Sequence, residues 1–134
     1  MENIEKTVLL KNNVELNLVF ERADNYYTIL AITPEQKQVA KMSFKLNAGT
    51  CYLNRIEIED INFAHIGLGT KMLEFMEEVA LMARCNNVDG KFYPFGDLGE
   101  YAKNFYEKNG YQIYKDGYET YISKYLSKEM ERTY

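Results

Sequence analysis

The spacing of apolar positions divides this chain into a strand-rich first half and a mixed second half. In the first half, apolar residues alternate with polar ones in short segments rich in β-branched and aromatic side chains, a pattern typical of half-buried strands. Turn residues such as Asn, Asp, Gly and Pro separate the segments. Because the connections are short, we expect neighbouring strands to pair antiparallel. The pattern predicts four strands, over residues 14–20, 26–32, 38–46 and 51–59.

The period then becomes helical. From Gly67 to Arg84, apolar residues recur at spacings of three and four, with charged residues between them, and Asn86-Asn87 marks the expected end. A strand on each side of this helix predicts a parallel pair. The remaining elements are a strand over 88–92, a helix over 98–108 that ends at Asn109-Gly110, and strands over 111–114 and 118–125 around the turn Asp116-Gly117.

This order predicts an α+β fold built on a mixed, mostly antiparallel and twisted sheet with two main helices. The chain has 134 residues, of which 46% are hydrophobic, and we therefore expect a single domain over residues 1–134. No linker, repeat or low-complexity segment interrupts the sequence.

Charge and composition exclude several function classes. Sixteen basic and 20 acidic residues give a net charge of −4, and without a basic field we expect no nucleic-acid partner. The two cysteines, Cys51 and Cys85, and one histidine do not form a zinc pattern, so we expect no metal and two buried, reduced thiols. No leader and no stretch long enough to span a bilayer is visible, which predicts a cytoplasmic protein that does not bind membranes.

Candidate chemistry begins at Gly67-Leu68-Gly69, between a strand and a helix. Glycines let the backbone approach a ligand closely, and the unpaired amides of a first helical turn attract phosphate oxygens. A dinucleotide fingerprint would need a third glycine at position 72, which is Met72, and no P-loop lysine follows. By itself the step indicates only that an anion could bind there, and a helix entry that simply needs small residues is the simpler interpretation.

A second motif lies downstream, where the helix over 98–108 ends in Phe105-Tyr106 and runs through Gly110-Tyr111 into a strand. The pair of motifs, in this order of strands and helices, resembles the GNAT superfamily of N-acetyltransferases. In that family, an Arg/Gln-x-x-Gly-x-Gly/Ala loop binds the pyrophosphate of acetyl-CoA, and a helix ending in Phe-Tyr-x-x-x-Gly-Phe lies beside the thiol. The resemblance implies a GNAT-like fold with acetyl-CoA as cosubstrate, in a cleft between the strands over 51–59 and 88–92.

The resemblance also assigns residues. Loop amides from Ile66 to Thr70 would bind the pyrophosphate, and a backbone amide at the end of the 51–59 strand would polarise the thioester. The implied cofactor-binding residues are Ile58, Glu59, Asp60, Ala64, His65, Ile66, Gly67, Leu68, Gly69, Thr70, Ala102, Phe105 and Tyr106.

Direct transfer to an amine needs an acid for the leaving thiolate and a base for the protonated amine. Tyr106 matches the tyrosine that often supplies the acid, although a core tyrosine on an amphipathic helix explains it as well. Glu57 and Glu59, on one strand face, are the candidate bases. In the simpler alternative, both are ordinary solvated acids and a chain of water molecules removes the proton. His65 is interpreted as an exposed loop residue, and neither cysteine is placed as a nucleophile.

Three departures from the family pattern bear on activity. Ala64 stands where the family has Arg or Gln, Gly99 stands where Asn is common, and the two helices that usually follow the first strand are absent. A face of the sheet would then be open, or covered by a second copy in a homodimer. The acceptor would be an amine of a small molecule or a protein. The alternatives are a non-catalytic acyl-CoA-binding or protein-interaction module and, more distantly, a nucleotide-binding regulatory domain.

Overall fold

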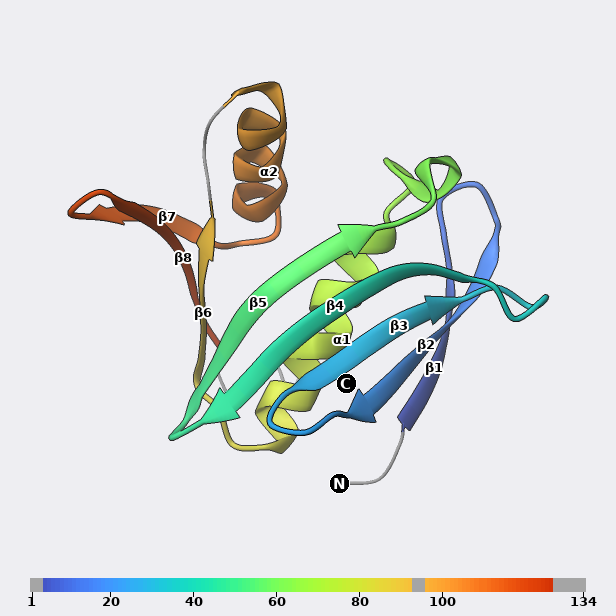
Figure 1. Cartoon of the computed structure of the whole chain (residues 1–134), viewed down its shortest axis with the longest axis horizontal. Helices are drawn as coiled ribbons and strands as arrows, with labels where there is room; N and C mark the ends of the chain where they lie inside the picture. Colours follow the sequence, from blue (N-terminus) through green and yellow to red (C-terminus); the bar gives the residue numbers. More distant parts are fainter. Residues whose placement is uncertain (1–3, 93–95, 127–134) are drawn as a thin grey trace. The chain divides into compact units, whose positions relative to one another are not determined.

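The computed structural model describes residues 4–92 and 96–126 and shows an α+β fold (Figure 1). Its elements are β1 (Ile4–Leu9), β2 (Glu15–Arg22), β3 (Tyr27–Ile32), β4 (Gln38–Asn47), β5 (Thr50–Ile58), the 3₁₀ helix η1 (Ile61–Phe63), α1 (Leu68–Met82), β6 (Asn87–Phe92), α2 (Gly96–Lys108), β7 (Gln112–Asp116) and β8 (Glu119–Tyr125).

All the described strands belong to one mixed sheet, in the order β1-β2-β3-β4-β5-β6-β8-β7. The predicted antiparallel pairing is confirmed for β2 with β3 and for β3 with β4, and β5 and β6, which flank α1, pair parallel as expected. That parallel pairing runs from Thr50 opposite Asn87 to Leu53 opposite Gly90.

One strand was not predicted. β1 pairs antiparallel with β2 along its whole length, from Ile4 opposite Phe20 to Leu9 opposite Glu15. Its sequence, Ile-Glu-Lys-Thr-Val-Leu, places Lys6 at an inward position, which hides the alternation. The structure shows why a lysine is tolerated: its ammonium lies 5.9 Å from the centre of the Phe75 ring and 2.6 Å from a carboxylate oxygen of Glu78, both on α1.

The described residues form two compact units. The first contains the residues up to Lys45 and Asn54–Glu78, and the second contains Leu46–Leu53 and the residues from Val79 onward. The expectation of a single domain therefore stays a prediction. Among the described residues, no helix has the length and apolar character needed to cross a bilayer.

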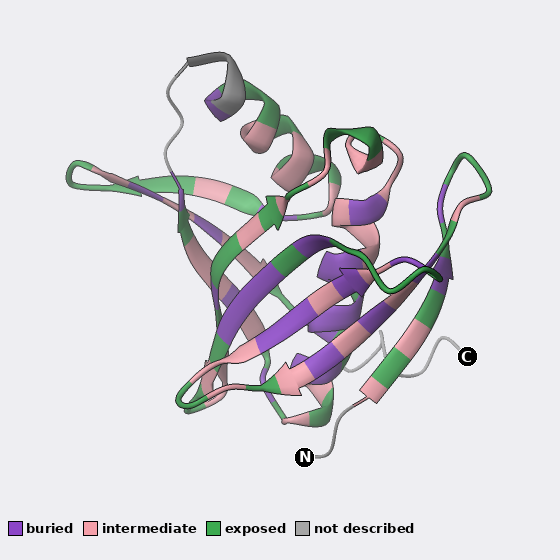
Figure 2. Ribbon diagram, turned by 45° about the vertical axis from the view of Figure 1, so that its right-hand side comes forward, coloured by how far each residue is buried: buried purple, intermediate pink, exposed green. Residues whose placement is uncertain are grey.

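The core of the first unit lies between α1 and the inner face of β1–β5 (Figure 1). Every second residue of β2 is buried, whereas β3 and β4 also bury consecutive residues, Thr28-Ile29 on β3 and Met42 to Phe44 on β4 (Figure 2). Three rings from these strands contact one another, with centroids 5.4 Å apart for Phe20 and Tyr27, 5.8 Å for Tyr27 and Phe44, and 6.2 Å for Phe20 and Phe44. These rings and the apolar stripe of α1 exclude water from the core of the first unit. This burial fixes which face of the sheet lies outward.

In the second unit, α2 packs on β6 and β7 through a cluster of aromatic rings. Tyr106 lies at its centre, with ring centroids 5.9 Å from Phe92, 5.3 Å from Phe105 and 5.7 Å from Tyr111. The predicted stop at Gly110 is confirmed: this glycine has φ = 89°, and the next amide, of Tyr111, returns to the Tyr106 carbonyl at 2.9 Å.

The predicted ends of the helices need correction. The first helix ends at Met82, before Asn86-Asn87, because Arg84 turns left-handed at φ = 64° and the Cys85 amide bonds back to Ala80. The second helix begins at Gly96, two residues before the predicted start. The sequence pattern misplaced both ends because it records apolar spacing and not the backbone bonds that close a helix.

Candidate functional site

The loop before α1 has the geometry of an anion site. Gly67 adopts φ = 92°, a left-handed conformation that favours glycine, and α1 begins at the next residue. The first turn leaves the amides of Leu68, Gly69 and Thr70 without helical partners. No acidic residue lies in that turn, so nothing there opposes a bound anion.

Lys11 adds a cation that the sequence analysis did not find. It lies in the turn between β1 and β2, and its amide donates to the carbonyl of Ile66 at 3.1 Å. Its side chain runs alongside Gly67: the position that a β-carbon would take on Gly67 lies 3.7 Å from the Lys11 Cε. Because β1 was not predicted, no sequence signal linked this turn to a loop more than fifty residues away.

The remaining loop residues take structural positions. Asp60 caps η1 by accepting from the Asn62 amide at 3.0 Å, and Ala64 ends that helix. A hydrogen bond from Lys37 at 2.9 Å holds the pKa of Asp60 below its ordinary value. His65 is exposed at φ = 62°, which agrees with its interpretation as an exposed loop residue.

The backbone amides at the end of β5 differ in whether they are available to a ligand. The amides of Glu59 and Asp60 both donate to the Val39 carbonyl, at 2.8 and 3.2 Å, so they are already engaged. Successive amides of a strand point to opposite edges, which directs the Ile58 amide away from β4. Of the three candidate amides at this end of β5, that of Ile58 is therefore the one suited to a ligand.

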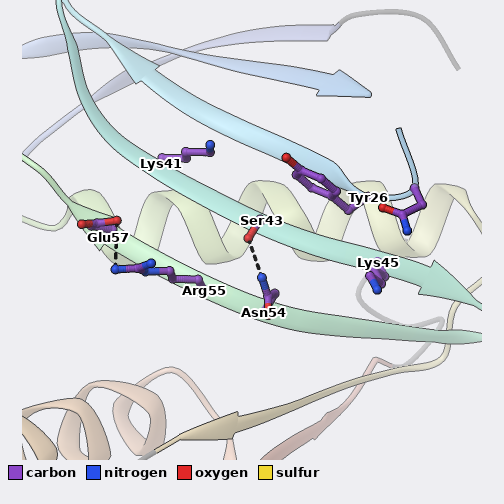
Figure 3. A pocket seen from close by; sticks show the side chains of 8 residues that line it. Tyr26, Lys41, Ser43, Lys45, Asn54, Arg55 and Glu57 are labelled. Atoms are coloured by element: carbon purple, nitrogen blue, oxygen red, sulfur yellow. Dashed lines mark hydrogen bonds and ion pairs between the residues drawn. The ribbon is translucent and has the colours of Figure 1, made fainter. Parts of the chain in front are cut away.

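The two candidate bases differ in their surroundings. Glu57 lines a pocket on the outer face of the first unit, where a carboxylate oxygen lies 3.3 Å from the Arg55 guanidinium (Figure 3). Glu59 accepts a hydrogen bond from the Gln38 side chain at 2.8 Å. Both carboxylates are exposed, so water reaches either one.

The burial pattern of β5 shifts next to Glu57. Cys51 and Leu53 are buried, whereas Ile56 and Ile58 are the half-buried residues farther along, so the inward positions move by one. Asn54 and Arg55, although successive, both line the outer pocket. A β-bulge produces such a shift, and bulges often re-aim a side chain beside an active site.

Tyr106, Ala102 and Phe105 belong to α2 in the second unit. Ala102 and Phe105 are half-buried on the same stretch of helix as Tyr106. Burial among the neighbouring rings raises the pKa of Tyr106 to about 12. Its hydroxyl therefore carries its proton throughout the neutral range, which is the form that a general acid requires.

The two cysteines lie in the interior of the protein. Cys51 and Cys85 are buried, as predicted, and burial raises the pKa of the Cys85 thiol. No group of three or more metal-ligating side chains gathers among the residues that the structure describes.

Comparison with solved structures identifies the architecture. The GNAT domain of S. lividans PAT superposes with a TM-score of 0.76 at 10% identity, covering 91% of this chain and 97% of that one. The chain has the GNAT fold. A GNAT-family acetyltransferase of Staphylococcus aureus gives a TM-score of 0.66 at 18% identity, over 77% of this chain and 69% of that protein.

A further structural neighbour was solved with a ligand. The PaiA N-acetyltransferase of Thermoplasma acidophilum, in complex with coenzyme A, gives a TM-score of 0.67 at 16% identity, over 76% of this chain and 62% of that one. No family model and no curated protein matches the sequence. The GNAT fold of this chain therefore rests on structural similarity.

Proposed function

We propose that this protein is an acetyl-CoA-dependent N-acetyltransferase that transfers acetyl directly to a primary amine. The observation that carries the proposal is the loop at Gly67, where a left-handed glycine, an acid-free helix start and Lys11 come together within a GNAT fold. These groups suit a pyrophosphate, because backbone amides and an ammonium bind phosphate oxygens without competing carboxylates.

Lys11 would supply the phosphate contact that Arg or Gln makes in the family and that Ala64 cannot make. The family places its cationic or amide side chain at the first position of the loop, whereas here the charge comes from the β1–β2 turn. The Lys11 ammonium makes no ion pair with any described residue, so it is available to a phosphate. The loop amides from Ile66 to Thr70 would supply the remaining donors.

The chemistry needs one proton removed and one proton added. Glu57 would accept the proton of the acceptor ammonium, which frees the nitrogen lone pair to attack the acetyl carbonyl. The Ile58 amide would stabilise charge on the carbonyl oxygen as the new C–N bond forms. Tyr106 would give its proton to the sulfur as the C–S bond breaks, leaving free coenzyme A. Glu59 remains the alternative base.

Calorimetry with acetyl-CoA tests the cofactor claim. We expect binding in the micromolar range, and a Lys11→Gln variant should bind about tenfold more weakly, the loss of one charge-assisted bond. Acetyl-pantetheine, which lacks the pyrophosphate, should bind both proteins equally. Lys115→Gln, an exposed lysine on β7, is the matched control and should leave acetyl-CoA affinity unchanged.

Two results would separate the alternatives. Absence of acetyl-CoA binding at millimolar concentration would overturn the cofactor claim. Tight binding without thiol release over a panel of amines would instead favour the non-catalytic acyl-CoA-binding module.

A further inference from the structure

A pocket of about 400 Å³ opens on the outer face of the first unit, the sheet face opposite α1 (Figure 3). This volume lies in the range of small-molecule sites. Side chains of β4 and β5 form its floor, and Asn25 and Tyr26 from the β2–β3 turn form its rim. Because this turn is short, with no helix between β2 and β3, the pocket opens directly to solvent.

The pocket is positively charged in an acidic protein. Lys41, Lys45 and Arg55 line it against a single carboxylate, Glu57, although the whole chain carries a net charge of −4. Glu57 pairs with Arg55 at 3.3 Å. The two lysines make no ion pair or hydrogen bond to any residue that the structure describes, so their charges are uncompensated.

Neutral donors accompany these cations. Ser43 accepts a hydrogen bond from the Asn54 amide at 3.1 Å, which leaves the Ser43 hydroxyl proton free to point into the pocket. Tyr26 directs its hydroxyl toward the same space (Figure 3). Ammonium groups with hydroxyl donors are the combination that binds phosphate and carboxylate oxygens.

A second pocket on the same unit provides an internal comparison. It has a similar volume, about 420 Å³, and its lining includes Glu5 and Glu15 but no lysine or arginine. The positive charge is therefore local to the first pocket and not a general property of the outer face.

We propose that this pocket binds the anionic group of the amine acceptor, a phosphate or a carboxylate, and so selects small amines that also carry a negative charge. The proposal rests on the proposed function for the identity of the ligand as an acceptor. Lys41 and Arg55, which lie at the same end of the pocket as Glu57, hold the anion, and Lys45 adds positive charge at the other end (Figure 3). Glu57, the proposed base, receives the ammonium of the same molecule. A polyamine would instead meet three positive charges and is disfavoured.

Nuclear magnetic resonance titration tests the pocket without requiring turnover. The probes are O-phosphoethanolamine and β-alanine, which carry a phosphate and a carboxylate, and ethanolamine and putrescine, which carry neither. We expect the first two to shift the Ser43 and Asn54 signals saturably and the last two to leave them unchanged. The anionic probe that binds more tightly identifies the preferred group.

A double variant, Lys41→Gln with Lys45→Gln, should weaken binding of the anionic probes by about tenfold, and raising the salt concentration should weaken it in the wild type. Lys115→Gln, outside the pocket, should behave as wild type. Equal shifts with ethanolamine, or unchanged affinity in the double variant, would overturn the proposal. Because acetyl-CoA is absent from this titration, its failure is distinguishable from failure of the proposed function, which calorimetry measures separately.

Discussion

Tyr106 shows how a side chain that fits a core position can also suit catalysis. Three aromatic rings surround it, which a packing role alone would explain. The same burial raises its pKa to about 12, so the hydroxyl stays protonated at neutral pH. The two roles are separable because only catalysis depends on the hydroxyl during the transfer step.

Replacing Tyr106 with phenylalanine should lower turnover roughly a hundredfold, the usual contribution of a general acid. Affinity for acetyl-CoA should change little, because the ring and its packing remain. Steady-state thiol release and calorimetry measure the two quantities. Tyr114→Phe, an exposed tyrosine on β7, is the control. Unchanged turnover in Tyr106→Phe would remove the acid role.

Tyr106 should also make stability depend on alkaline pH. An unfolded tyrosine loses its proton near pH 10, whereas the folded Tyr106 keeps it until about pH 12. The unfolded state therefore binds fewer protons between these values, and the free energy of unfolding falls as pH rises through them. We expect a loss of about 2 to 3 kcal/mol. Denaturant unfolding at several pH values should show a smaller loss in Tyr106→Phe; an equal loss would contradict the assignment.

At the scale of elements, the loop before α1 depends on backbone conformation more than on side chains. Gly67 holds φ = 92°, and the turn at Lys11 joins the loop by a backbone bond to Ile66. The same loop leads directly into the first turn of α1, which begins at Leu68. Replacing Gly67 with a residue that disfavours positive φ would therefore change the loop and the start of α1 more than it would change the core.

Gly67→Ala should therefore weaken acetyl-CoA binding, and it should lower the free energy of unfolding by about 1 kcal/mol. The added methyl group would only touch Lys11 at an ordinary contact distance, so the cost is conformational. Gly49→Ala is the matched control, because Gly49 has φ = 85° in a turn with open space around it. It should lose similar stability and keep full affinity. Normal affinity in Gly67→Ala would argue against the pyrophosphate site.

At the scale of the whole molecule, the sheet includes one parallel pair of strands, β5 and β6, which are joined by four residue pairs. Gly90 lies in this segment, opposite Leu53 on one side and Ile122 on the other. The missing side chain permits the close approach of all three strands.

The homodimer suggested by the open sheet face stays a prediction. Sedimentation would measure the oligomeric state.

Gly90→Ala should lower the free energy of unfolding by about 1 to 3 kcal/mol, the usual cost of overpacking. A β-carbon there would lie 3.0 Å from the Leu53 carbonyl oxygen and 3.2 Å from Ile122 Cγ1. The first neighbour is backbone and has little room to move. Urea denaturation measures the change, with Lys91→Ala at the next position as a control for altered strand propensity. An unchanged free energy of unfolding in Gly90→Ala would show that the strands can move apart without losing stability.

The sequence by itself determined the order of the strands and α-helices after β1, the glycine step before α1 and the aromatic motif at Tyr106. These features are local: apolar period, turn chemistry and glycine at positive φ are properties of a few neighbouring residues. The same local rules failed at β1, where Lys6 occupies an inward position that only contact with Phe75 and Glu78 makes acceptable.

Only the tertiary structure decided which distant groups meet. It placed Lys11 beside Gly67, engaged the amides of Glu59 and Asp60 with Val39, and brought three cations and Glu57 into one pocket. All three arrangements depend on strand pairing, and the pocket depends also on the shift along β5. Pairing is set by which face the whole core buries. A sequence pattern records the periods of single segments, whereas a charge beside a loop or a carboxylate depends on how those segments pack.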